Sequence, residues 1–295
     1  MDKIATPTKT REILNKYGIR LSKRRGQNFL VDPVAAAKIA SNACSEGDYV
    51  VEIGPGIGAL TQMLLQRAKK LVAIEIDPLL VQVLREEFKD FKNLTVIEGD
   101  ALDFNLDALA EEHFSLEKGH KGYKIVGNLP YYVTTPILFH IFETAPAAAS
   151  GTVMLQKEVA ERISACPGSK AYGSLSVASQ YYSEPQVIAR VSHKLFFPQP
   201  EVESVVLRLE IRDNPPVKVR DPQLFFTIVR AAFNQRRKTV VNALSNLIPE
   251  LSKEQAGGIL SLAGIHPSRR GETLDIADFS LVANAMFELM EEEED

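Results

Sequence analysis

The residues best suited to chemistry in this chain form the tetrapeptide Asn128-Leu129-Pro130-Tyr131. It follows an apolar run, 123–127, that predicts a buried strand, and it precedes Thr135-Pro136, which favours the start of a helix. The Asn128 side-chain oxygen and the Leu129 carbonyl, stiffened by Pro130, could accept both hydrogens of an aromatic amino group, and Tyr131 offers its ring a flat surface. The pattern predicts a pocket for an adenine removed from its stack. Turns also favour Asn, Pro and Tyr for conformational reasons alone.

A second motif, the glycine-rich Gly54-Pro55-Gly56-Ile57-Gly58, lies upstream between an apolar run, 48–53, and a helical pattern from Leu60 to Leu65. Glycines at such a strand-to-helix turn let the backbone approach a ligand closely, and the amides at the helix start face that ligand. The spacing is G-x-G-x-G, whereas dinucleotide-binding turns have G-x-G-x-x-G. The motif therefore favours a nucleoside ligand other than a nicotinamide dinucleotide.

Two acids follow on the next predicted strands. Glu75 lies near the end of the run 70–77 and follows Gly54 by 21 positions. This spacing suits a carboxylate that accepts hydrogen bonds from both ribose hydroxyls. Asp100 follows the run 94–97 and could accept an adenine amino group. No Lys or Arg follows the glycine turn as a phosphate clamp, so we expect a nucleoside without phosphates, and S-adenosyl-L-methionine fits.

Length and composition indicate the class of protein. The 295 residues are enough for about two domains, and the 45% hydrophobic content allows a sizeable core. Cys44 and Cys166 lack metal-ligand or redox spacing, and the five histidines give no zinc signature, so we expect no metal and a reducing compartment. The sequence shows neither an apolar run of membrane length nor a signal peptide, so we expect a cytoplasmic protein with no membrane association. We also expect a monomer.

The net charge of −4 conceals an uneven distribution. Residues 288–295 contain six acids and no base, and setting them aside turns the net charge from −4 into +2. Residues 1–27 hold eight Lys and Arg against two acids, and residues 218–242 hold six against one. Such basic islands match a phosphate backbone, although a single charge run is more often a solvated helix face. Two islands beside a base pocket favour nucleic acid.

The order of predicted elements indicates an α/β protein. Residues 33–212 alternate helix and strand, and the runs 186–191 and 204–209 predict an antiparallel pair that closes a mainly parallel sheet. Asn214-Pro215-Pro216 reads as a linker, and the signals beyond it are helical. We therefore expect a Rossmann-like methyltransferase domain and a small all-α domain. The expected divisions are a basic segment closing over the cofactor (1–32), the methyltransferase domain (33–213), a helical RNA-binding domain (214–290) and an acidic tail (291–295).

At this point the sequence resembles a known family over nearly its whole length, on motifs beyond those described above. These are Gly26-Gln27-Asn28-Phe29-Leu30, Ile74-Glu75-Ile76-Asp77, Met154-Leu155-Gln156-Lys157-Glu158-Val159, Phe196-x-Pro198-x-Pro200-x-Val202-x-Ser204 and Ala232-Phe233-Asn234-Gln235-Arg236-Arg237-Lys238-Thr239. The chain is similar to the ribosomal RNA adenine dimethyltransferases, most closely the small-subunit (kasugamycin-resistance) type. Tyr132 departs from the family pattern, in which a small polar residue often occupies this position. The departure concerns the shape of the pocket rim and not the chemistry.

The resemblance implies roles for individual residues. Asn28 and Leu30 would close over the cofactor, Gly54 and Gly56 would line its methionine end, Glu75 would hold its ribose and Asp100 its adenine, and Asn128 would border its sulfonium. The substrate implied is a pair of adjacent adenosines in a hairpin near the 3′ end of 16S rRNA, each dimethylated on its 6-amino group. The partner would be 16S rRNA within an immature small ribosomal subunit.

Further residues are expected around the base and the RNA. A flipped adenine needs a second aromatic face, and Phe196 is our candidate because Pro198 and Pro200 stiffen the loop that presents it; the alternative is that Phe196 fills the core. The expected phosphate contacts are Lys23, Arg24, Arg25, Arg236, Arg237 and Lys238.

Three other functions stay open on the sequence. A DNA adenine methyltransferase would share the pocket, but such enzymes usually place two prolines after the Asp or Asn, where this chain has Leu129. A large-subunit resistance methyltransferase is closer, and the helical tail with its basic run argues against it. An assembly factor for immature ribosomal subunits, with methylation secondary, is the non-enzymatic alternative.

Overall fold

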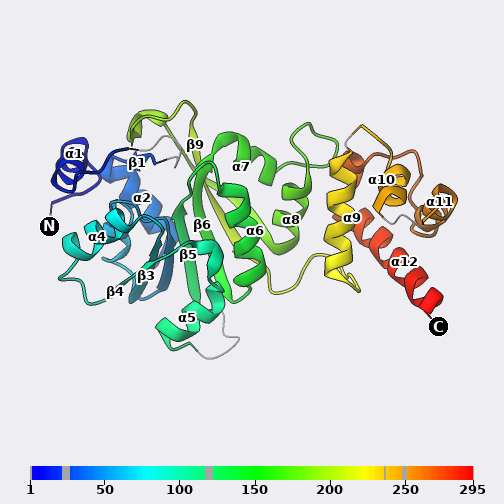
Figure 1. Ribbon diagram of the computed structural model, residues 1–295, viewed down its shortest axis with the longest axis horizontal. Coiled ribbons are helices and arrows are strands. Elements are labelled where there is room, and N and C mark those ends of the chain that lie inside the picture. Colours follow the sequence, from blue (N-terminus) through cyan, green and yellow to red (C-terminus); the bar gives the residue numbers. More distant parts are fainter. Residues whose placement is uncertain (1, 22–26, 117–121, 236, 248–250, 295) are drawn as a thin grey trace. The chain divides into compact units, whose positions relative to one another are not determined.

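A seven-stranded sheet forms the centre of the first part of the chain (Figure 1). The computed structural model describes residues 2–21, 27–116, 122–235, 237–247 and 251–294. The sheet has the strand order β4-β3-β2-β5-β6-β9-β7. Its strands are β2 (Tyr49–Ile53), β3 (Lys70–Glu75), β4 (Leu94–Glu98), β5 (Tyr123–Asn128), β6 (Ala148–Gln156), β7 (Ser183–Val191) and β9 (Ser204–Ile211).

The strand order creates one position where ligands are expected. The five strands from β4 to β6 are parallel, and the chain builds outward from β2 in one direction and from β5 in the other. In open α/β sheets, ligands bind at the carboxyl ends of the strands beside such a switch point. The carboxyl ends of β2 and β5 carry the glycine turn and Asn128, so the two sequence motifs meet there.

The predicted antiparallel pair is confirmed. β9 lies between β6 and β7 and pairs antiparallel with both, so the sheet is mixed and mainly parallel, as expected. A separate two-stranded sheet joins β1 (Phe29–Leu30) to β8 (Phe196–Phe197), with Phe29 opposite Phe197 and Leu30 opposite Phe196.

Helices connect and cover these strands. α4 packs against β3 and β4, and α2 packs against β5 and β6. Asp32 is the N-cap of α2, since its carboxylate accepts the Ala35 N–H at 2.6 Å. Among the described residues, no helix has the length and apolar character needed to cross a membrane. The helices of this part are α1 (Pro7–Lys16), α2 (Pro33–Ala43), α3 (Thr61–Leu64), α4 (Pro78–Glu87), α5 (Leu106–Phe114), α6 (Thr134–Thr144) and α7 (Lys157–Ile163).

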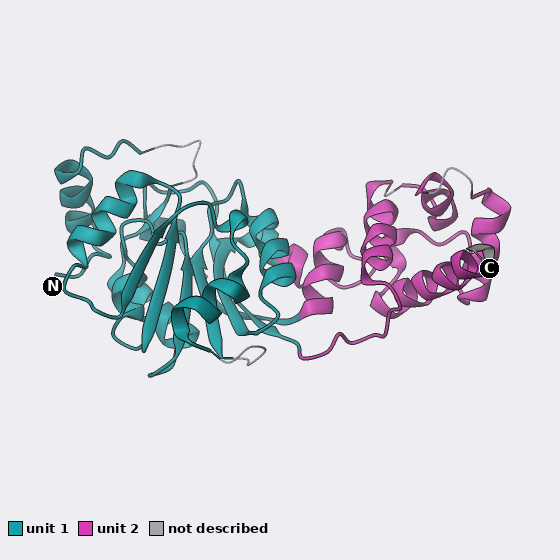
Figure 2. Ribbon diagram, turned by 60° about the horizontal axis from the view of Figure 1, so that its bottom comes forward, with its two compact units in different colours: residues 1–160, 183–212 teal, residues 161–182, 213–295 magenta. Residues whose placement is uncertain are grey.

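The chain divides into two compact units (Figure 2). Unit 1 consists of Met1–Ala160 and Ser183–Arg212, and unit 2 consists of Glu161–Tyr182 and Asp213–Asp295. The helices of unit 2 are α8 (Ser174–Tyr182), α9 (Pro222–Asn234), α10 (Val240–Leu247), α11 (Lys253–Leu262) and α12 (Ile276–Glu294). A capping box starts α11, in which the side chains of Ser252 and Gln255 each accept the other residue's backbone N–H. The functional limits of the domains stay a prediction.

One helix of unit 2 comes from the middle of the chain. The ring of Tyr181 in α8 stacks on Phe225 of α9, with centroids 5.2 Å apart, and Tyr182 stacks on Phe226 at 5.3 Å. These contacts place 161–182 with the carboxyl-terminal helices, although the sequence analysis assigned that stretch to the methyltransferase domain. The aromatic residues of α8 and α9 therefore stabilise unit 2 through contacts between segments far apart in the sequence, which local sequence patterns do not predict.

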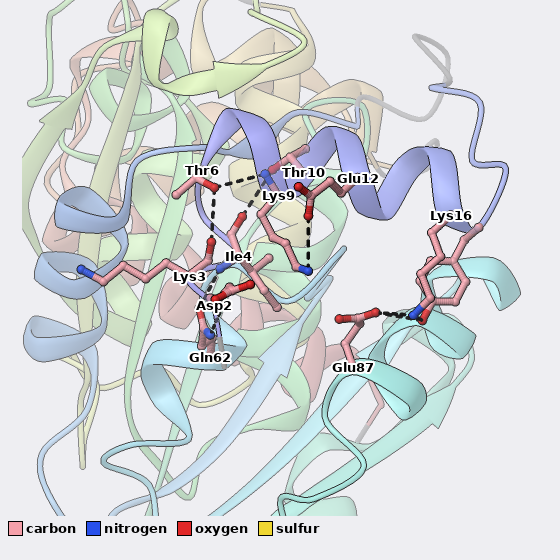
Figure 3. A network of polar contacts seen from close by, with 11 residues as sticks. Asp2, Lys3, Ile4, Thr6, Lys9, Thr10, Glu12, Lys16, Gln62 and Glu87 are labelled. Carbon is pink, nitrogen blue, oxygen red and sulfur yellow. Dashed lines mark hydrogen bonds and ion pairs between the residues drawn. The ribbon is translucent and has the colours of Figure 1, made fainter.

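The sequence analysis also missed α1, which is docked against the body of unit 1 (Figure 3). Ile4 and Ile13 are fully buried in the same apolar cluster as Leu64 of α3. Gln62 accepts the Ile4 N–H at 2.9 Å and donates to the Asp2 carbonyl at 2.8 Å. At the other end of α1, Lys16 forms an ion pair with Glu87 at 2.7 Å.

We expect Gln62→Ala to lower the free energy of unfolding by about 1–3 kcal/mol, because it leaves the buried Ile4 N–H without its acceptor. Denaturant unfolding measures this change. Lys16→Gln is the matched variant at the exposed carboxyl end of α1, and we expect it to cost much less than Gln62→Ala because surface ion pairs contribute little. Equal costs at both positions would contradict the assignment of Gln62 as the main anchor.

Candidate functional site

A cavity opens at the carboxyl ends of β2, β3 and β5, where the switch point predicts a ligand. All the predicted cofactor residues line it: Asn28, Leu30, Gly54, Gly56, Glu75, Asp100 and Asn128. So do the rest of the predicted catalytic tetrapeptide, Leu129, Pro130 and Tyr131, together with Tyr132 at the rim. The parallel sheet therefore brings together residues that lie up to about one hundred positions apart, while their individual roles stay predictions.

The glycine turn is shaped by contacts from two other segments. Gly56 has a φ of +62°, in the region that favours glycine, and its N–H donates to a Glu75 carboxylate oxygen at 3.0 Å. A Cβ added to Gly56 would lie 3.1 Å from the Phe29 ring. The turn is thus held between the acid that ends β3 and the amino-terminal strand β1.

Glu75 is placed to bind a polyol. Its side chain is 5% exposed and accepts the Gly56 and Asp77 N–H groups at 3.0 Å each. Burial raises the pKa of Glu75 above its ordinary value. Two ribose hydroxyls are suitable donors to the remaining acceptor sites of such a carboxylate, since they replace lost water without adding charge. Asp100, the predicted adenine acceptor, also caps a short helix through the Leu102 N–H at 3.0 Å.

A further acid in the cavity was not assigned a role from the sequence. Glu52 is 1% exposed and accepts a hydrogen bond from the Thr61 hydroxyl at 2.7 Å. Burial, with a smaller contribution from the Glu75 charge, raises the pKa of Glu52 to about 8. Its position two residues before the glycine turn was the only available signal, and the sequence did not reveal that it would be buried.

The charges around the cavity favour a cationic ligand without phosphates. Glu52, Glu75, Asp77 and Asp100 line it, and its described lining residues include neither Lys nor Arg. A phosphate would meet only like charge here, whereas a sulfonium and an ammonium would stabilise the ionised carboxylates. These carboxylates fit S-adenosylmethionine, whose ribose would lie at Glu75 and whose methionine end would lie along Gly54 and Gly56.

The Asn128 amide is oriented by the amino-terminal segment. Its nitrogen donates to the Asn28 carbonyl at 3.1 Å, which directs the amide oxygen elsewhere. The following backbone is fixed as well, because the Leu129 N–H donates to the Met154 carbonyl of β6 at 3.0 Å. The two groups predicted to accept the hydrogens of an amine are therefore held by segments on either side of the loop.

The two aromatic candidates differ in their surroundings. Tyr131 lines the cavity and is half-buried, as a base-stacking ring requires. Phe196 is not among the lining residues; it is 2% exposed, belongs to the apolar cluster of unit 1 and lies opposite Leu30 in the β1–β8 pair. This burial favours the alternative that Phe196 fills the core, and its stacking role stays a prediction.

Only part of the predicted RNA surface can be located. Lys23, Arg24, Arg25 and Arg236 lie outside the described residues. Arg237 and Lys238 are exposed in unit 2, at the segment between α9 and α10.

Arg270 lies beside them, which the sequence analysis missed. An antiparallel bridge joins Thr239 to Arg270, and the Val240 N–H donates to the Arg269 carbonyl at 2.9 Å. The next residue, Gly271, lies close to α9, since a Cβ there would lie 2.8 Å from the Ala232 Cβ. The exposed Arg270 therefore joins the basic group, and the nearest sequence signal was the Arg269-Arg270-Gly271 run.

Comparison with known proteins supports the same chemistry. A family model described as ribosomal RNA adenine dimethylase matches residues 18–281. The chain is 46% identical over 285 residues to the ribosomal RNA small subunit methyltransferase A of Alkaliphilus oremlandii, covering 96% of this chain and 98% of the relative. It is 47% identical over 289 residues to the protein of the same name from Geobacillus thermodenitrificans, covering 97% and 98%.

Two solved structures share the fold. A dimethyladenosine transferase from Plasmodium falciparum superposes with a TM-score of 0.69 at 25% identity, over 89% of this chain and 97% of that one. The 23S rRNA methyltransferase ErmE superposes with a TM-score of 0.62 at 24% identity, over 88% and 99%, which shows likeness of fold alone.

We expect Glu75→Ala to weaken S-adenosylmethionine binding by roughly 2–3 kcal/mol, because hydrogen bonds to a buried carboxylate are lost. Isothermal titration calorimetry measures the affinity. Glu98→Ala is the matched control, since Glu98 lies opposite Glu75 on β4, is exposed and does not line the cavity. Unchanged affinity in Glu75→Ala would remove Glu75 from the cofactor site.

We expect Glu52 to make the stability of the cofactor-free protein fall as the pH rises from about 5 to 8. Its folded-state pKa of about 8 lies above the ordinary 4.5, so between these pH values the folded protein binds a proton at Glu52 that the unfolded chain does not. The favourable contribution of Glu52 to the free energy of unfolding is therefore lost as the pH rises through this window. Relative to Glu52→Gln, the free energy of unfolding should fall by up to about 1.4 kcal/mol per pH unit. Urea unfolding across this range tests it, and parallel pH profiles for the two proteins would contradict it.

Proposed function

Because the chain belongs to the ribosomal RNA adenine dimethylase family, we propose that it methylates two adjacent adenosines in a hairpin near the 3′ end of 16S rRNA. S-adenosylmethionine is the methyl donor, and each 6-amino group receives two methyl groups. The near full-length similarity to small-subunit methyltransferases supports this choice of RNA. We further propose that the protein acts in the cytoplasm, as a monomer, on the immature small subunit.

The observation that carries the proposal is the orientation of Asn128 at the carboxyl end of β5. Its amide nitrogen is engaged by the Asn28 carbonyl, so its oxygen can accept a hydrogen from an adenine amine. The Leu129 carbonyl would accept the second hydrogen. Two acceptors on one amine favour a pyramidal nitrogen whose lone pair is available, whereas the free adenine amine is a poor nucleophile because its lone pair is delocalised into the ring.

The protein's contribution to the reaction is positioning and electrostatic stabilisation. The bound cofactor supplies an electrophilic methyl group on a sulfonium. Asn128 and Leu129 hold the amine, and Tyr131 supports the face of the base. The proton leaves to water after transfer, because an alkylated aryl ammonium is acidic, so no dedicated general base is required. After the first transfer, the pocket must tolerate a methyl group where one hydrogen bond was.

The exposed residues of unit 2 are suited to hold the RNA backbone. Arg237, Lys238 and Arg270 present charged side chains from two segments joined by the Thr239–Arg270 bridge. Contacts of this kind bind phosphates of any sequence, so they hold the RNA while the base pocket selects the adenosine.

One assay separates the proposal from its alternatives. Single-turnover transfer from labelled S-adenosylmethionine is compared on assembly-stage small subunits, naked 16S rRNA, naked 23S rRNA and duplex DNA. We expect transfer to the small-subunit substrate, at the two adjacent adenosines. Preferred labelling of 23S rRNA or DNA would overturn the assignment of the RNA, and tight binding to small subunits without transfer would favour an assembly factor.

We expect Asn128→Ala to abolish methyl transfer while leaving RNA affinity nearly unchanged, because one acceptor contributes little to a large electrostatic interface. Single-turnover kinetics and a filter-binding titration measure the two properties. Cofactor affinity should fall somewhat, because Asn128 borders the same cavity. Turnover within about tenfold of the wild type, or ~1.4 kcal/mol of barrier, would contradict the amine-acceptor mechanism.

We expect Arg237→Ala, Lys238→Ala and Arg270→Ala to weaken binding of all RNA sequences alike. Each lost phosphate contact should lower the magnitude of the slope of log affinity against log salt concentration by about 0.9, taking the value for B-DNA. Arg220→Ala is the control, because Arg220 is exposed in the same unit but is ion-paired with Glu288 at 3.0 Å. Unchanged slopes in the three variants would indicate a solvated surface without RNA contact.

A further inference from the structure

Ser204, the first residue of β9, is a buried polar residue to which the chemistry above gives no role. Its side chain is 1% exposed, and its hydroxyl lies 2.9 Å from the phenol oxygen of Tyr131. The two residues are 73 positions apart and belong to different motifs, the tetrapeptide and the proline-rich run that ends at Ser204. The hydrogen bond therefore connects two segments that had no evident relation in the sequence.

The serine is a fixed point in the sheet. Ser204 lies opposite Gln156 of β6 and opposite Val191 of β7, so its strand is paired on both sides. The residue before it is held as well, because the Glu203 carbonyl accepts the Lys157 N–H at 3.0 Å. Tyr131, in contrast, lies in the turn between β5 and α6. The bond thus ties a loop side chain to a rigid strand.

The position of this bond on the ring has a geometric consequence. The phenol oxygen lies on the long axis of the tyrosine ring, so a partner at that oxygen determines the direction in which the ring points. A ring that served only as a stacking surface could equally be phenylalanine. The hydroxyl and its buried partner are therefore features that stacking alone does not require.

We propose that Ser204 is a positioning residue for methyl transfer, holding the Tyr131 ring in the direction that supports the face of the target adenine. This inference rests on the adenine site proposed above. Ser204 itself does not line the cavity, so it would touch neither substrate nor cofactor there. It acts through Tyr131, in the same way that the Asn28 carbonyl acts through the Asn128 amide.

A double-mutant cycle of Ser204→Ala and Tyr131→Phe tests the proposal, because each variant removes one end of the same hydrogen bond. We expect each single variant to lower the single-turnover rate constant on assembly-stage small subunits about fivefold, or ~1 kcal/mol for one neutral hydrogen bond. The double variant should stay within about twofold of either single one. Affinities for RNA and S-adenosylmethionine should be unchanged in all three. Two effects that multiply in the double variant would overturn the proposal.

Two further variants separate positioning from general packing. Ser150→Ala is the matched control, since Ser150 is equally buried in β6, and its hydroxyl has no hydrogen-bond partner among the described residues. It should keep the wild-type rate. Ser204→Thr retains a hydroxyl and should restore most of the rate lost in Ser204→Ala. A Ser150→Ala defect as large as that of Ser204→Ala would assign both serines to packing and overturn the proposal.

A measurement without methyl transfer distinguishes failure of this inference from failure of the proposed function. In NMR spectra of protein with labelled tyrosine, Ser204→Ala should shift or broaden the ring signals of Tyr131, assigned through Tyr131→Phe. If the wild type transfers no methyl group and the signals still change, the proposed function is wrong while the positioning by Ser204 stands. Unchanged Tyr131 signals would overturn the positioning whatever the enzyme does.

Discussion

The parallel pairing of β2 with β5 is the constraint on which the site depends. It sets Ile53 opposite Gly127, so the glycine turn and the Asn128 loop leave the sheet side by side. The strands approach so closely that a Cβ on Gly127 would lie 2.8 Å from the Ile53 carbonyl oxygen. A larger side chain at 127 would separate the two ends, because a carbonyl of the backbone cannot move aside without disturbing the sheet. One strand pair therefore places both the glycine turn and the Asn128 loop.

The amino-terminal strand β1 completes what the sheet begins. The Phe29 ring lies against Gly56, and the Asn28 carbonyl accepts from the Asn128 amide, so one short segment contacts both the glycine turn and the Asn128 loop. Its pairing with β8 adds the proline-rich segment. The docking of α1 through Gln62 holds the residues before this helix against the rest of unit 1.

Electrostatics explain why this cavity suits a sulfonium nucleoside. Burial raises the pKa of Glu52 to about 8 and also raises the pKa of Glu75, so burial favours bound protons over negative charge at both carboxylates. A ligand with an ammonium and a sulfonium can replace those protons, and its ribose can donate to Glu75. The site therefore selects by charge as well as by shape. Phosphate-bearing ligands are disfavoured at the cavity, whereas the exposed basic side chains of unit 2 are suited to phosphates.

The sequence by itself determined the alternation of strands and helices, the antiparallel closing pair, and the membership of Glu75, Asp100 and Asn128 in one site. These follow from local periodicity and from the rule that parallel strands carry their ligands at their carboxyl ends. Only the tertiary structure decided that Phe196 is buried and that Ser204 bonds Tyr131. It also decided the docking of α1, the place of α8 in unit 2 and the approach of Arg270 to Lys238. Each depends on partners tens of positions away, and burial is a property of the packed chain that no local pattern carries.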